Sequence, residues 1–200
     1  MLSKAFLYAG SEPARPLELR AGPLSLFFEP HTAFLRRLRL GDHEVVRGLY
    51  AAVRDENWAT ITPRVTLREQ EVKSDSFRLA FDCACQRGGI DYFWRGEVTG
   101  DSTGSIRYSF DGEARSEFLR NRIGICVLHP ITECAGRPVA VAHTDGTIEQ
   151  GSFPRDISPH QPFFDVRGLS YEVANTGITA QLEMTGDAFE MEDQRNWTDA

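Results

Sequence analysis

The feature that most constrains the fold is an alternation of apolar and polar side chains that recurs along almost the whole chain. The segment 77–85, FRLAFDCAC, shows it clearly, and this two-residue period is typical of a strand with one buried face. Turn sequences such as Gly41-Asp42 and Asp145-Gly146 separate the alternating segments. No stretch of a dozen residues has a convincing helical period, so the pattern predicts an all-β protein.

The expected extended segments are 17–20, 24–29, 32–40, 43–54, 64–73, 77–85, 90–98, 106–110, 120–130, 131–136, 139–143, 147–152, 163–171, 180–184 and 188–192. So many strands in one antiparallel sheet would curl or split into two packed layers. We therefore expect a large antiparallel β-sandwich. Because no internal repeat or linker interrupts the chain, residues 1–200 are expected to form a single domain.

Composition excludes several classes of protein. The chain has 41% apolar and 26% charged residues, which is ordinary for a globular protein, and a net charge of −7. That charge and the scattered basic residues argue against nucleic acid as a partner. The chain contains neither an apolar run long enough to cross a membrane nor a recognisable signal peptide. We expect a cytoplasmic protein that does not bind membranes.

Cysteine and histidine spacing gives no support for a local metal site. Cys83 and Cys85 continue the apolar face of their strand, which predicts buried, reduced thiols. The spacing of His129, His143 and His160 matches no local metal motif, so a metal site could only be assembled from distant strands. GxSxG, P-loop and GxGxxG motifs are absent, which argues against serine hydrolases, nucleotide hydrolases and dehydrogenases. We expect no metal and no cofactor.

The segment RNRIGICVLHP, residues 120–130, combines an apolar centre with charged ends. Both faces of such a strand are apolar, so we expect a core strand that is covered on both sides. Arg120, Arg122 and His129 at its ends must then reach solvent, a ligand or a carboxylate. The candidate carboxylate partners are Glu190, Glu192 and Asp193.

Polar side chains are also dense in the segment FEMEDQRNWTDA, residues 189–200. Glu190 and Glu192 share one face of an extended chain, so both carboxylates could point into one cavity and one could act as an acid or base. A solvated edge strand would give the same pattern. The proline-rich loop at 153–162 and the loop around Trp58 are further candidates for functional loops.

The segments RNRIGICVLHP, ISPHQPFFDVRGL and FEMEDQRNWTDA together resemble the D-apionate lactonase family of bacterial sugar-acid catabolism. The resemblance implies hydrolysis of a five-membered sugar lactone to the free aldonate in the cytoplasm, with the lactone as a small-molecule partner. Family members are longer, so we expect this chain to be the N-terminal β-domain, with an exposed edge or apolar surface where the rest packs. At the fold level the pattern also resembles the supersandwich of aldose mutarotases.

Our first hypothesis is a lactonase in which Glu192 acts as base while His129 and Arg122 polarise the lactone carbonyl within one pocket. The expected substrate-binding residues are Arg120, Asn121, His160, Glu190, Arg195, Asn196 and Trp197. One alternative is a non-catalytic carbohydrate-binding scaffold in which Trp197 or Trp58 stacks on sugar. Another is an epimerase with a histidine and a glutamate on opposite sides of a sugar ring.

Overall fold

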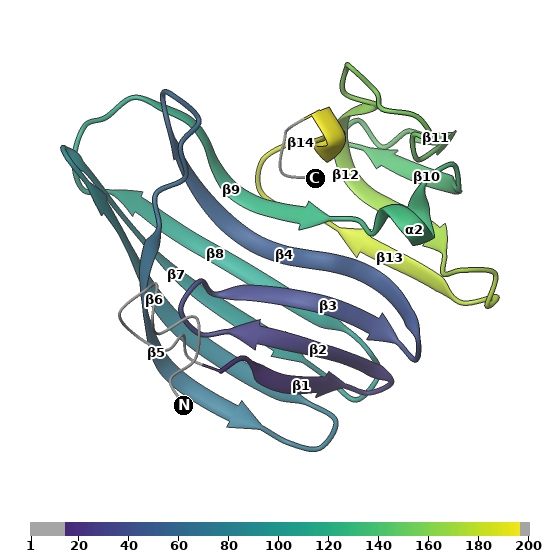
Figure 1. Cartoon of the computed structure of the whole chain (residues 1–200), viewed down its shortest axis with the longest axis horizontal. Coiled ribbons are helices and arrows are strands. Elements are labelled where there is room, and N and C mark those ends of the chain that lie inside the picture. Colours follow the sequence, from purple (N-terminus) through teal and green to yellow (C-terminus); the bar gives the residue numbers. More distant parts are fainter. Residues whose placement is uncertain (1–14, 197–200) are drawn as a thin grey trace, which may run out of the picture. The chain divides into compact units, whose positions relative to one another are not determined.

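The computed structural model describes residues 15–196 (Figure 1). Its strands are β1 (Leu17–Ala21), β2 (Leu24–Glu29), β3 (Phe34–Leu40), β4 (His43–Asp55), β5 (Pro63–Val72), β6 (Phe77–Arg87), β7 (Ile90–Gly100), β8 (Ile106–Ala114), β9 (Arg120–Leu128), β10 (Pro138–His143), β11 (Ile148–Ser152), β12 (Phe163–Glu172), β13 (Thr179–Glu183) and β14 (Phe189–Met191). The helical elements in this range are α2 (Ile131–Cys134) and the 3-10 turn η1 (Gln194–Asn196). The all-β prediction is confirmed.

The contacts divide the chain into two compact units, Met1–Leu128 and His129–Ala200. The single domain expected from the sequence stays a prediction. None of the helices between residues 15 and 196 is long and apolar enough to span a membrane.

The first unit is an antiparallel β-sandwich. One sheet has the strand order β1-β2-β3-β4-β9, and the other has the order β5-β6-β7-β8. The sheets pack face to face, since the rings of Phe28 on β2 and Phe81 on β6 lie 5.5 Å apart between centroids. The Tyr108 hydroxyl of β8 also donates to the Ala33 carbonyl at 3.0 Å. Large side chains such as Phe28, Phe81 and Trp94 are fully buried between the layers, which confirms the predicted sandwich.

Aromatic rings cover glycines on the neighbouring strand within the sheet β5-β6-β7-β8. Phe81 is the direct cross-strand partner of Gly96, and Phe77 is the partner of Gly100. A Cβ atom on Gly96 would lie 2.2 Å from a ring carbon of Phe81, and one on Gly100 would lie 2.2 Å from a ring carbon of Phe77. Each ring therefore occupies the space that a side chain on its partner would need.

The second unit is built on one smaller antiparallel sheet. Its strand order is β11-β10-β12-β13, and β14 pairs with the first part of β12. The buried residues that form its core are Cys134, Val139, Val141, Phe153, Phe163, Val166, Leu169 and Tyr171. Strands β10 and β12 supply most of this core.

Strand β9 differs from the sequence-based expectation. Figure 1 shows it beside the long strand β4, with pairs such as Tyr50 to Cys126 and Val53 to Ile123, at the end of its sheet. None of its residues is fully buried. The expectation of a core strand covered on both sides is therefore wrong. An edge position leaves one side of the strand without a hydrogen-bonded neighbour, so apolar residues on both faces do not by themselves indicate a central strand.

The segment after β9 is also not extended. Cys134 N–H donates to the Pro130 carbonyl at 3.0 Å, and Ala135 N–H donates to the Ile131 carbonyl at 2.9 Å. These bonds close the single helical turn α2, with Cys134 buried and Ile131 exposed. The expected strand at 131–136 is wrong because one turn is too short to show a helical period in the sequence.

Candidate functional site

The start of β9 braces the turn that joins β4 to β5. The side-chain amide of Asn121 donates to the carbonyls of Asp55, at 3.2 Å, and Glu56, at 2.6 Å. The Asp55 carboxylate accepts the backbone N–H groups of Asn57 at 2.9 Å and Ala59 at 3.0 Å. These contacts fix the turn, so the observed role of Asn121 is structural, and its expected contact with substrate stays a prediction.

The other two polar residues at this end of β9 point outward. Arg120 and Arg122 are both exposed. The guanidinium carbon of Arg122 lies 5.9 Å from the ring centre of Trp58, a cation–π distance. Trp58 is itself 42% exposed. This part of the first unit therefore presents an aromatic face and guanidinium groups to solvent.

His129 lies in the second unit against two aromatic rings. Its ring centre is 5.1 Å from that of Phe153 and 5.7 Å from that of Tyr171. Burial lowers the pKa of His129 to about 4, so the imidazole is neutral at neutral pH. Its buried Nδ1 has no hydrogen-bond partner in the part of the chain that the structure describes. A neutral imidazole can donate one hydrogen bond, but it supplies no positive charge.

Arg195 and Asp193 form a clasp over the loop that follows β11. The Asp193 carboxylate accepts Nε of Arg195 at 2.9 Å, Nη2 of Arg195 at 2.8 Å and the Ser158 N–H at 2.8 Å. The side-chain hydrogen bonds from Arg195, with the backbone N–H groups of Ser158 and Arg195, lower the pKa of Asp193 to about 2. Arg195 also donates to the carbonyls of Arg155 at 2.8 Å and Asp156 at 2.9 Å. The carboxylate and the loop backbone thus satisfy most of its donors.

The remaining predicted residues of the second unit lie around this clasp. The Asn196 amide donates to the Ser158 carbonyl, and the Ser158 hydroxyl donates to the carbonyl of the exposed His160 at 2.8 Å. The structure thus brings Arg195, Asn196 and His160 to one loop. Glu190 lies on β14 and Glu192 follows that strand, both half-buried. Trp197 lies outside the described residues.

The three residues expected to carry the chemistry are divided between the units. Arg122 belongs to the first unit, whereas His129 and Glu192 belong to the second. Their expected meeting in one pocket stays a prediction. In the range 15–196, no group of three or more His, Cys, Asp or Glu side chains is arranged to hold a metal ion.

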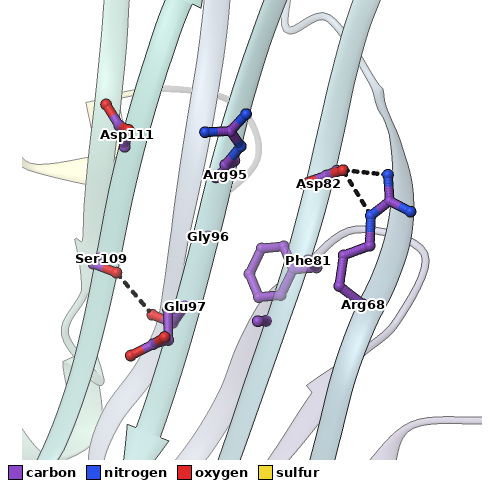
Figure 2. Close-up of a pocket in the computed structure, with 9 residues that line it drawn as sticks. Arg68, Phe81, Asp82, Arg95, Gly96, Glu97, Ser109 and Asp111 are labelled. Atoms are coloured by element: carbon purple, nitrogen blue, oxygen red, sulfur yellow. Dashed lines mark hydrogen bonds and ion pairs between the residues drawn. The ribbon is translucent and has the colours of Figure 1, made fainter.

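A hollow of about 270 Å³ lies on the outer face of the sheet β5-β6-β7-β8 (Figure 2). Arg68 binds Asp82 there through Nε at 2.7 Å and Nη2 at 2.6 Å. Arg95 stands between Asp82 and Asp111, which are its direct partners on the two neighbouring strands. This hollow was not predicted from the sequence, because residues of four strands line it. The only local signal was the row of charged residues that alternate with the buried ones.

Residues 6–200 match the family described as D-apionate lactonase, N-terminal domain. Over 192 residues the chain is 37% identical to the D-apionate lactonase of Brucella anthropi, a match that covers 94% of this chain and 30% of that relative. No solved structure matches the chain. The resemblance seen in the sequence is confirmed, and the chain belongs to the D-apionate lactonase N-terminal domain family.

Proposed function

We propose that this chain is the N-terminal β-domain of an enzyme that hydrolyses a five-membered sugar lactone, of the D-apionate type, to the free aldonate. The observation that carries the proposal is the 37% identity, over 94% of the chain, to a protein named D-apionate lactonase. That name favours the lactonase over the carbohydrate-binding scaffold and the epimerase. Since the chain spans 30% of that relative, the activity is proposed for the whole protein and not for this chain alone.

The proposed chemistry assigns roles to three residues. Glu192 takes a proton from water as the water oxygen attacks the lactone carbonyl carbon. Arg122, which is always charged, and one N–H of the neutral His129 stabilise the resulting oxyanion. The bond from the carbonyl carbon to the ring oxygen then breaks, and the ring oxygen takes the proton held by Glu192 to become a hydroxyl. The low pKa of His129 supports a role as neutral hydrogen-bond donor, so Arg122 must supply the positive charge.

The proposed location is the cytoplasm. The four cysteines all lie in the described residues and form no disulfide, and Cys83, Cys85 and Cys134 are buried. Free thiols persist in reducing compartments, whereas disulfides prevail in secreted proteins of this size. The cysteines therefore support the location, and fractionation of cells that express the protein would test it.

The activity is tested by following acid release from a five-membered sugar lactone with the protein in its full length. The expected result is net hydrolysis that yields one equivalent of aldonate and one of acid. The open-chain aldonate serves as the matched control and should release no acid. Exchange of a carbon-bound proton without hydrolysis would instead identify an epimerase, and binding without turnover would identify a scaffold.

A further inference from the structure

The turn between β4 and β5 holds a tryptophan in a backbone conformation that bulky residues rarely adopt. Trp58 has a φ of 67°, in the left-handed region that glycine and asparagine enter most easily. The residue is 42% exposed, so burial of its side chain only partly offsets the cost of this conformation. Strained residues of this kind cluster at ligand-binding positions, where the surrounding structure holds them in place.

Three different elements hold this turn rigid. Within the turn, the Trp58 N–H donates to the Asp55 carbonyl at 3.1 Å, and the Ala59 N–H donates to the Asp55 carboxylate at 3.0 Å. From β9, the Asn121 amide binds two carbonyls of the turn. From β6, Arg87 pairs with the second oxygen of the Asp55 carboxylate. The exposed ring is thus presented by a fixed backbone, which lowers the entropy lost when a ligand binds to it.

The neighbouring guanidinium gives the exposed ring a specific chemistry. The guanidinium carbon of Arg122 lies 5.9 Å from the ring centre of Trp58. An indole face packs against the C–H groups of a sugar ring, while a guanidinium donates several hydrogen bonds to hydroxyl or carbonyl oxygens. One indole face matches one small ring. The pair therefore suits a single small sugar ring with oxygen substituents at its edge.

We propose that Trp58 and Arg122 form a binding platform for the five-membered sugar ring of the substrate, with Trp58 stacked on the ring and Arg122 bound to its oxygen atoms. The identity of the ligand rests on the proposed lactonase function. Trp58 is a binding residue in this proposal and takes no part in the chemical step. The platform lies entirely within the first unit, so it requires no residue of the second.

The test uses Trp58→Ala, Trp58→Phe and Trp58→Gly in the full-length protein. For a five-membered sugar lactone, Trp58→Ala should raise KM by about tenfold and change kcat less than twofold, because a lost stacking contact of ordinary strength corresponds to roughly that factor. Trp58→Phe should keep most of the affinity. Trp58→Gly should lose the affinity while its thermal stability stays equal or rises, because glycine fits the positive φ. This variant separates loss of binding from loss of folding.

A second measurement is independent of catalysis. Saturation-transfer NMR with methyl β-D-ribofuranoside, a five-membered sugar ring without a lactone bond, should detect contact with the wild-type protein and not with Trp58→Gly. Leu119→Ala is the matched control, because Leu119 is a 72% exposed apolar residue of the same unit. If no lactone is hydrolysed but the furanoside signal depends on Trp58, the binding platform is supported and the lactonase function is not. Wild-type KM and an unchanged NMR signal in Trp58→Gly would overturn the platform.

Discussion

The clasp between Asp193 and Arg195 predicts a stability difference that depends on pH in a defined way. Asp193→Asn keeps the shape of the side chain and removes its charge. The Asp193 side chain is only 6% exposed, and it accepts two side-chain N–H donors of Arg195 and the Ser158 N–H. An amide in its place offers one acceptor oxygen and two donors, so it cannot accept all of these bonds. The variant should therefore loosen the loop at 153–162.

The size of the effect follows from the pKa of Asp193, which lies at about 2 in the folded protein instead of the ordinary 3.8. At about 1.36 kcal/mol for each tenfold change in proton affinity, this difference corresponds to roughly 2 kcal/mol of stability. Because the folded pKa is the lower one, the contribution is complete above about pH 4 and is lost as the pH falls through about 2. The amide introduced by Asp193→Asn does not titrate, so the two proteins should converge in acid.

The assay is hydrogen exchange, read on peptides from residues 153–162 between pH 7 and pH 2. We expect an opening free energy about 2 kcal/mol lower in Asp193→Asn at pH 7, with the gap closing below pH 4. His129 also makes the folded protein less stable as the pH falls from about 6.5 to about 4, because its pKa of about 4 lies below the ordinary 6.5. That loss occurs in both proteins and cancels in the difference. A gap under about 0.5 kcal/mol at pH 7, or one that stays constant down to pH 2, would refute the reasoning.

Arg122→Ala should lower lactone turnover roughly a hundredfold to a thousandfold, the usual loss for one oxyanion donor, with an unchanged circular dichroism spectrum. Glu192→Gln should keep the fold and flatten the acidic limb of the pH–rate profile; full activity in both variants would place the catalytic groups elsewhere. Cys83 and Cys85 should resist thiol reagents in the native protein, because burial raises the pKa of both thiols, and rapid labelling would contradict this. Phe81→Ala should lower the free energy of unfolding by about 3 to 5 kcal/mol in urea titrations, since it empties the contact with Phe28.

Strands such as β6 and β7 were predictable because each of them buries one face, and this leaves a two-residue period in the sequence. Pairing between distant strands leaves no such mark. The partnership of β4 with β9 joins segments that lie far apart in the chain, and it places β9 at a sheet edge. Apolar side chains on both faces of β9 therefore predicted a central strand wrongly, because half-buried edge positions and fully buried central positions accept the same residue types.

The polar residues of this region could be recognised from the sequence, but their contacts within the chain could not. Asn121 and Arg195 were singled out as polar residues in unusual surroundings, and their donors are directed at backbone carbonyls. A sequence does not reveal whether an amide or a guanidinium faces a ligand or a loop, because both surroundings require the same donors. The positive φ of Trp58 was equally hidden, since tryptophan carries no preference for that conformation.

The rings that lie over Gly96 and Gly100 make the residues that β7 can accept depend on the residues of β6. A side chain at residue 96 has no room while Phe81 keeps its ring, and the same holds for residue 100 and Phe77. The glycine of a pair can therefore gain a side chain only after, or together with, the loss of the ring that covers it. In related chains we expect small and large residues to exchange places across these two pairs, so that β6 and β7 diverge in step and not independently.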